Sequence, residues 1–149
     1  LRVLRRRDAY SRRLMHTVYL SLGSNLGNRE ENLTRAMDEI EKLIGKIVRR
    51  STFHITEPWG FRSDNLFVNA AVCCHTEHSP RGVLVLTQEI ERGMGRENKS
   101  AGGNYSDRII DIDILYYDDI TVDEPDLKIP HPHINERDFV MKPLREIME

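Results

Sequence analysis

Cysteine, proline and glycine are all scarce in this chain of 149 residues, which has 2, 6 and 9 of them respectively. Such low counts exclude collagen-like, low-complexity and disulfide-scaffold proteins. The two cysteines, Cys73 and Cys74, are adjacent, and neighbouring side chains of a strand point to opposite faces. They are therefore poor disulfide partners. Nothing indicates an oxidising compartment, and we expect a cytoplasmic protein.

Long apolar runs are also missing, and no segment approaches the roughly 20 residues that cross a bilayer. We therefore expect no membrane role. The main part of the chain has no excess of basic residues either. Residues 1–16 contain six arginines and one acid, which leaves 16 basic and 23 acidic residues from Thr17 onward. This acidic body argues against a nucleic-acid-binding surface spread over the domain.

The arginine-rich segment 1–16 lacks the apolar core of a secretory signal. A transit peptide and a basic arm for RNA or membrane are alternatives. We favour a disordered leader over residues 1–16, followed by a single domain over residues 17–149.

The hydrophobic pattern predicts strands at 17–22, 46–55, 66–76 and 108–117, and helices at 33–44 and 80–94. Ser79 and Pro80 are typical of a helix start, and a brief helix is expected to close the chain. The order strand, helix, strand, strand, helix, strand (βαββαβ) predicts a ferredoxin-like α+β sandwich, with helices packed on a mostly antiparallel sheet. This fold hosts many functions, so the function has to be inferred from the site residues.

Asp111 and Asp113 are the clearest chemical feature of the sequence. Positions i and i+2 of a strand share a face, so both carboxylates oppose the face that carries Ile110, Ile112 and Ile114. Two acids about 7 Å apart repel each other unless they are solvated or bridged by a cation. Mg²⁺ is held in this way, together with substrate phosphates and water. A polar outer face without a metal explains the pattern equally well.

Three basic residues, Arg96, Lys99 and Arg108, bracket a glycine-bearing segment next to these acids. Guanidinium groups suit bidentate phosphate contacts, and an ammonium suits a polyphosphate. Acids that hold a metal beside basic residues are typical of phosphoryl transfer, whereas a solvated charged loop is the alternative. Neither a Walker motif nor a kinase-type glycine loop occurs.

Two phenylalanines form a second candidate site. Phe67 and Asn69 share one strand face, and Phe139 follows a proline-histidine segment. Two rings could hold a flat heteroaromatic ligand while the Asn69 amide binds its edge, although single aromatics in strands are more often core residues. Two further pairs carry weak signals: His131 and His133 could bind a transition metal, and Gln88 and Glu91 are typical of a solvated helix face.

Several stretches occur in a specific order: LGSNLG (22–27), FVNAAV (67–72), DRIIDIDIL (107–115), IPHP (129–132) and RDFVMKPL (137–144). Together they resemble the 6-hydroxymethyl-7,8-dihydropterin pyrophosphokinase family of folate biosynthesis. The resemblance runs from Val18 to the end of the chain. It implies a Mg²⁺-dependent transfer of pyrophosphate from ATP, the co-substrate, to the hydroxymethyl group of a reduced pterin, giving AMP and the pterin diphosphate.

By matching position, the resemblance also implies residue roles. Asp111 and Asp113 are expected to hold two Mg²⁺ ions and to act with Arg96 and Arg108 in catalysis. The implied pterin contacts are Thr56, Pro58, Trp59, Phe67, Asn69 and Phe139. The implied ATP contacts are Gln88, Glu91, Arg96, Lys99, Arg108, Ile114, His131 and Arg137. The loops 56–65 and 96–107 are expected to close as lids. Glu57, Asn98 and Tyr105 depart from the family pattern.

Two other functions compete with this interpretation. A ligand-binding or regulatory module could use the two phenylalanines, but it gives the acids and arginines no common purpose. An RNA-binding domain could stack bases on sheet aromatics, but no RNP motif is present and the body is acidic. We therefore expect ATP and a reduced pterin as small-molecule partners, with no nucleic acid, no membrane and no obligate protein partner.

Overall fold

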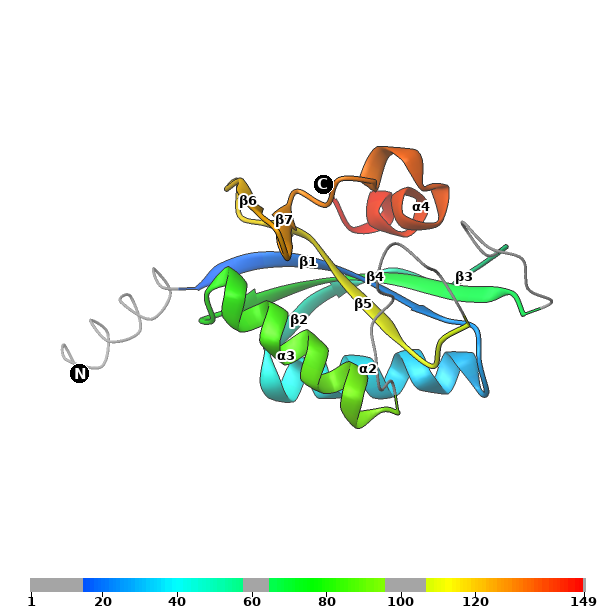
Figure 1. The fold of residues 1–149 in the computed structure, drawn as a ribbon. Helices are drawn as coiled ribbons and strands as arrows, with labels where there is room; N and C mark the ends of the chain where they lie inside the picture. Colours follow the sequence, from blue (N-terminus) through cyan, green and yellow to red (C-terminus); the bar gives the residue numbers. More distant parts are fainter. Residues whose placement is uncertain (1–14, 58–64, 96–106, 149) are drawn as a thin grey trace.

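The computed structural model describes residues 15–57, 65–95 and 107–148 (Figure 1). Most of the expected leader and of the two expected lids lies outside these ranges. In chain order the elements are β1 (His16–Ser24), α2 (Arg29–Leu43), β2 (Gly45–Arg50), β3 (His54–Thr56), β4 (Phe67–Thr76), α3 (Pro80–Gly93), β5 (Asp111–Tyr117), β6 (Val122–Glu124), β7 (Leu127–Ile129), the 3-10 turn η1 (Ile134–Glu136) and α4 (Asp138–Ile147). None of the helices described is long and apolar enough to cross a membrane.

The main sheet has the strand order β2-β4-β1-β5, and β3 also pairs with β4. Every pairing in it is antiparallel. The predicted α+β class with an antiparallel sheet is therefore confirmed. β4 lies between β1 and β2, the two strands that flank α2 in the chain. β1 likewise lies between β4 and β5, the two strands that flank α3, as in a split β-α-β pair. The β6–β7 hairpin forms a separate two-stranded sheet.

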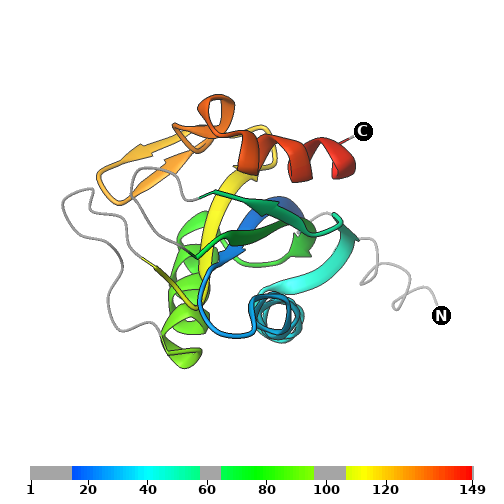
Figure 2. The ribbon, with the colours of Figure 1, turned by 90° about the vertical axis from the view of Figure 1, so that its right-hand side faces the viewer.

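Helices cover both faces of the sheet. Figures 1 and 2 show α2 and α3 on one side and α4 on the other. Side chains alternate along β4, so Ala70, Val72 and Cys74 pack with α2 and α3, while Ala71 and Cys73 pack with α4. The alternation therefore lets β4 contribute to two hydrophobic clusters, one on each face of the sheet.

The expected helix starts and ends have clear local causes. The Ser79 side chain accepts a hydrogen bond from the backbone N–H of Gly82 (3.1 Å), and Pro80 opens α3, as predicted. Asn28 caps α2 in the same way, accepting from the backbone N–H of Glu31 (3.2 Å). Gly45 follows the end of α2 closely and begins β2.

Two strand boundaries differ from the prediction. The expected strand 46–55 is divided into β2 and β3, because Ser51 interrupts the ladder. The Ser51 backbone N–H donates to the Ala71 carbonyl (2.9 Å), and its hydroxyl oxygen accepts the Ala71 N–H (2.9 Å). At the chain start, β1 includes His16, whose Nδ1 lies 2.7 Å from Asp118 Oδ2. The sheet therefore begins within the segment assigned to the leader.

Candidate active site

The polar face of β5 lies on the same side of the sheet as α4. Gly23 of β1 pairs with Asn69 on one side and with Asp111 on the other, and Ser21 pairs with Asp113. This register places residues from three strands in two adjacent rows. A pocket opens over these rows, lined by Ser21, Gly23, Thr56, Glu57, Phe67, Asn69, Arg108, Asp111, Asp113, Arg137 and Phe139.

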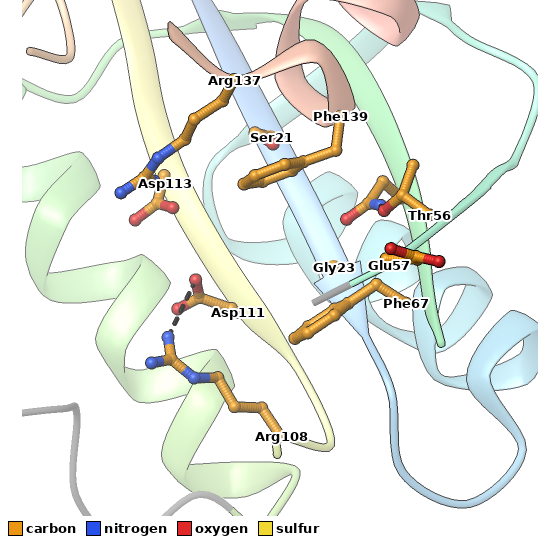
Figure 3. Close-up of a pocket in the computed structure, with 11 residues that line it drawn as sticks. Ser21, Gly23, Thr56, Glu57, Phe67, Arg108, Asp111, Asp113, Arg137 and Phe139 are labelled. Carbon is orange, nitrogen blue, oxygen red and sulfur yellow. Dashed lines mark hydrogen bonds and ion pairs between the residues drawn. The ribbon is translucent and has the colours of Figure 1, made fainter. Parts of the chain in front are cut away.

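The pocket has two chemically different ends (Figure 3). At one end Asp111 and Asp113 project from β5 between the guanidinium groups of Arg108 and Arg137. At the other end lie the rings of Phe67 and Phe139 with polar groups beside them. The structure thus brings eight predicted site residues together in one pocket, namely Thr56, Phe67, Asn69, Arg108, Asp111, Asp113, Arg137 and Phe139.

At the charged end, Arg108 Nη1 lies 3.1 Å from Asp111 Oδ2. The Arg108 side chain is 8% exposed, and that of Asp111 is 20% exposed. A guanidinium held against a carboxylate in this way keeps positive charge directly beside a possible cation site.

Asn25 fixes the backbone of Arg108, a role that no sequence pattern predicted. The Asn25 Oδ1 accepts the Arg108 N–H (2.6 Å), and the Asn25 N–H donates to the Arg108 carbonyl (3.0 Å). Its Nδ2 also donates to Asp107 Oδ1 (2.7 Å). Asn25 lies in the LGSNLG stretch, so the motif was visible in the sequence, but its partner 83 residues away was not.

At the aromatic end, Asn69 Nδ2 donates to Thr56 Oγ1 at 2.6 Å, which orients the amide. Gly23 is needed here because of a close approach. A Cβ at this position would lie 2.9 Å from Asn69 Oδ1 and 3.5 Å from Phe67 Cδ1. Glu57 also lines this end, although no sequence pattern predicted a site role for it.

Arg137 joins the two ends of the pocket. It is 6% exposed, and its Cζ lies 5.7 Å from the centroid of the Phe139 ring. This distance is typical of a cation–π contact. Arg137 directly precedes α4 and Phe139 lies in its first turn, so the start of the last helix brings both residues to the pocket.

A second cavity lies between α3, β5 and the β6–β7 hairpin. Three predicted ATP contacts, Gln88, Ile114 and His131, line its wall together with Leu84, Ile112, Asp113, Pro125, Asp126, Leu127, Lys128 and Pro132. Asp113 lines both cavities. A ligand in either one therefore borders the same carboxylate.

Arg81 connects the hairpin to the start of α3. Its Nη1 lies 3.0 Å from Asp126 Oδ2, and its Nη2 lies 2.8 Å from Asp126 Oδ1 and 3.0 Å from Glu124 Oε1. These contacts hold opposite walls of the second cavity together.

Glu91 differs from the expectation of a solvated helix face, because it is only 2% exposed. Its Oε2 accepts the backbone N–H of Ile112 at 2.9 Å, which ties α3 to β5. The described wall of the second cavity does not include it. A direct contact between Glu91 and ATP stays a prediction.

The carboxylates of the pocket fit a Mg²⁺ ion that is shared with substrate phosphates and water. No group of three or more His, Cys, Asp or Glu side chains that could hold a metal occurs in the part of the chain that the structure describes. Two half-buried carboxylates two residues apart remain, Asp111 and Asp113. Mg²⁺ is commonly bound by one or two carboxylates that share it with substrate phosphates and water. His131 and His133, with ring centroids 6.0 Å apart, are likewise not part of such a group.

Four predicted site residues, Pro58, Trp59, Arg96 and Lys99, lie outside the described residues. Their roles stay predictions.

Comparisons with known proteins agree with one another. A family model described as 7,8-dihydro-6-hydroxymethylpterin-pyrophosphokinase (HPPK) matches residues 19–149. A 2-amino-4-hydroxy-6-hydroxymethyldihydropteridine pyrophosphokinase of Porphyromonas gingivalis is 47% identical over 134 residues, covering 89% of this chain and 91% of that protein. A protein of the same name from Methylorubrum extorquens is 39% identical, covering 89% of this chain and 83% of its own.

A solved structure supports the fold independently. Plasmodium falciparum HPPK-DHPS matches with a TM-score of 0.72 at 20% identity, over 89% of this chain. The present chain spans 42% of that longer chain.

Proposed function

Because this chain belongs to the 7,8-dihydro-6-hydroxymethylpterin-pyrophosphokinase family, whose enzymes act in folate biosynthesis, we propose that its substrates are ATP and 6-hydroxymethyl-7,8-dihydropterin. The reaction is a Mg²⁺-dependent transfer of pyrophosphate. The pterin hydroxyl oxygen bonds to the β-phosphorus of ATP and releases its proton to water, the bond from that phosphorus to the α-phosphate oxygen breaks, and AMP leaves. The products are AMP and the pterin diphosphate.

One observation carries this proposal: Asp113 lines both the aromatic pocket and the second cavity. A pterin held between Phe67 and Phe139 and a nucleotide held beside Gln88 and His131 would meet at this carboxylate. The reaction needs such a meeting point, because transfer depends on bringing the alcohol to the phosphorus in a fixed geometry.

The residues of the chain then perform three tasks. The two phenylalanine rings and Asn69 hold and orient the pterin. Arg108 and Arg137 stabilise negative charge that develops on the phosphate oxygens, since both are largely buried at the charged end. Two Mg²⁺ ions held by Asp111 and Asp113 would neutralise the phosphates when bound. No strong protein base is required, because positioning and charge stabilisation carry this type of reaction.

The competing functions lack comparable support. A ligand-binding module does not require the acids and arginines that line the pocket with the two rings. An RNA-binding surface conflicts with the excess of acids from Thr17 onward.

The direct test is product analysis by mass spectrometry. The protein is incubated with ATP, Mg²⁺ and 6-hydroxymethyl-7,8-dihydropterin, and AMP and the pterin diphosphate are expected in equal amounts. The 6-methyl analogue, which has no hydroxyl group to accept pyrophosphate, is the matched control and should give neither. Formation of ADP instead of AMP, or no turnover, would contradict the proposal.

A further inference from the structure

Arg81 lies one helical turn before the part of α3 that lines the second cavity. Leu84 and Gln88, which form that wall, follow Arg81 by three and seven residues. Side chains at this spacing share one face of a helix. Arg81 therefore lies on the same side of α3 as Gln88, which is a predicted ATP contact.

The tight turn of the β6–β7 hairpin forms the opposite wall of this cavity. Pro125 and Asp126 make the turn, since Glu124 pairs directly with Leu127. In the described part of the chain, the two strands pair with each other and not with the main sheet. A two-stranded hairpin is marginally stable by itself, so its position depends on contacts with the rest of the protein.

The hairpin is attached to the domain at two places. Along β7, Leu127 and Ile129 are buried in the main hydrophobic cluster. At the turn, Arg81 contacts both carboxylate oxygens of Asp126, at 2.8 and 3.0 Å, and Glu124 Oε1 at 3.0 Å. We call these three contacts the Arg81 clamp. Single exposed ion pairs stabilise little, but a guanidinium that binds one carboxylate with two nitrogens and also contacts a second holds its partners in a fixed orientation.

We propose that Arg81 is a positioning residue for the nucleotide, because its clamp holds the β6–β7 turn against α3 and so sets the width of the second cavity. This inference rests on the proposed function. Asp126 belongs to the described lining of the cavity and Arg81 does not, so Arg81 acts through Asp126. Without the clamp, a nucleotide has to order the turn when it binds, and this cost lowers its affinity.

The test measures nucleotide affinity after the clamp is broken with and without a change of charge. Arg81→Gln removes one positive charge, whereas the double variant Arg81→Gln/Asp126→Asn leaves the net charge unchanged. Calorimetric titration with a non-hydrolysable ATP analogue and Mg²⁺ should show binding about 3- to 10-fold weaker than wild type in both. Wild-type affinity in the double variant would overturn the inference, because Arg81 would then act only by offsetting negative charge near the phosphates.

Steady-state kinetics provide the second measurement. In both variants KM for ATP should rise by a similar factor, while KM for the pterin and the melting temperature should hardly change. Equal rises in both KM values would indicate a general structural defect and would also overturn the inference.

Lys42→Gln is the matched control, because it breaks an exposed ion pair with Glu39 inside α2, and neither residue belongs to the described lining of the two cavities. It should behave as wild type. Nucleotide binding is measured without turnover, so the two hypotheses can fail separately. A wild-type protein that binds the ATP analogue but forms no AMP would contradict the proposed function alone. Wild-type affinity in Arg81→Gln would contradict the positioning role alone.

Discussion

At the scale of single residues, Asp111 and Asp113 occupy matching positions on β5 but have different surroundings. Asp111 pairs with Arg108, which is largely buried, whereas Asp113 borders both cavities. Asp111 therefore combines its place in the pocket with an ion pair, and Asp113 lies where the two cavities meet.

Asp113→Asn keeps the shape of the side chain and removes the charge that a metal would need. Turnover should fall by about a hundredfold or more. Asp111→Asn should also lose turnover, and it should unfold at a lower temperature than the wild-type protein, because a partner of Arg108 is removed. Steady-state AMP formation and differential scanning calorimetry measure the two effects. Unchanged turnover and unchanged Mg²⁺-dependent binding of an ATP analogue in both variants would contradict this mechanism.

Gly23 allows a direct steric test of the aromatic end. Gly23→Ala places a Cβ 2.9 Å from Asn69 Oδ1, so the amide or the neighbouring Phe67 ring has to move. Affinity for the pterin should fall about tenfold, while affinity for an ATP analogue should hardly change. Gly93→Ala is the control, because no atom lies within 4 Å of its added Cβ and alanine favours the helix. Calorimetric titration that finds equal losses for both ligands would argue against a separate pterin pocket.

At the scale of elements, Glu146 joins α4 to the segment before and within β3. Its Oε1 accepts the Thr52 backbone N–H (2.9 Å) and the Thr52 hydroxyl (2.8 Å), and its Oε2 contacts His54 Nε2. Arg49 Nη1 also donates to the Ile147 carbonyl at 3.2 Å. Because α4 carries Phe139 and β3 carries Thr56, this junction aligns two walls of the pocket.

These hydrogen bonds, first the one from the Thr52 backbone and then the one from His54, hold the pKa of Glu146 below its ordinary value of 4.5. A lowered folded-state pKa means that the stabilisation is complete above pH 4.5 and is lost as the pH falls through the folded-state value. Glu146→Gln should therefore lower the free energy of unfolding by about 0.5–1 kcal/mol at pH 7, since the side chain is one third exposed. Urea denaturation should find a smaller difference at pH 3. The same difference at both pH values would contradict the role of the charge.

The sequence predicted those parts of the fold and site that depend on local pattern. Alternation in β5 was sufficient to place Asp111 and Asp113 on one face, and Ser79 with Pro80 marked the start of α3. Contacts between distant segments were not visible. The hydrogen bonds that Asn25 Oδ1 accepts from the Arg108 N–H and that Glu91 Oε2 accepts from the Ile112 N–H depend on how α3, β1 and β5 come together. The division of strand 46–55 depends on a single hydroxyl that pairs with another strand.

At the scale of the whole molecule, the segment 1–16 has no periodic apolar positions with which to dock. Removal of residues 1–14 should leave both melting temperature and turnover unchanged. Removal of residues 1–16 also deletes His16 and its contact with Asp118, and should lower the melting temperature by about 1–3 °C. Thermal melts of the two truncated proteins beside the full chain test this. A large loss of stability in the shorter truncation would show that the leader packs against the domain.

Because helices cover both faces of the sheet, the separation of each helical layer from the sheet can be measured on its own. Cys73 lies beneath α4 and Cys74 lies beneath α2 and α3, both as free thiols, and burial raises the pKa of Cys74 to about 12. A thiol-labelling reagent can reach each cysteine only when its own layer separates from the sheet. In single Cys→Ala variants, Cys73 should label faster than Cys74, because fewer buried residues of the described chain hold α4 in place. The labelling rates of two adjacent residues thus report separately how often each helical layer opens to solvent.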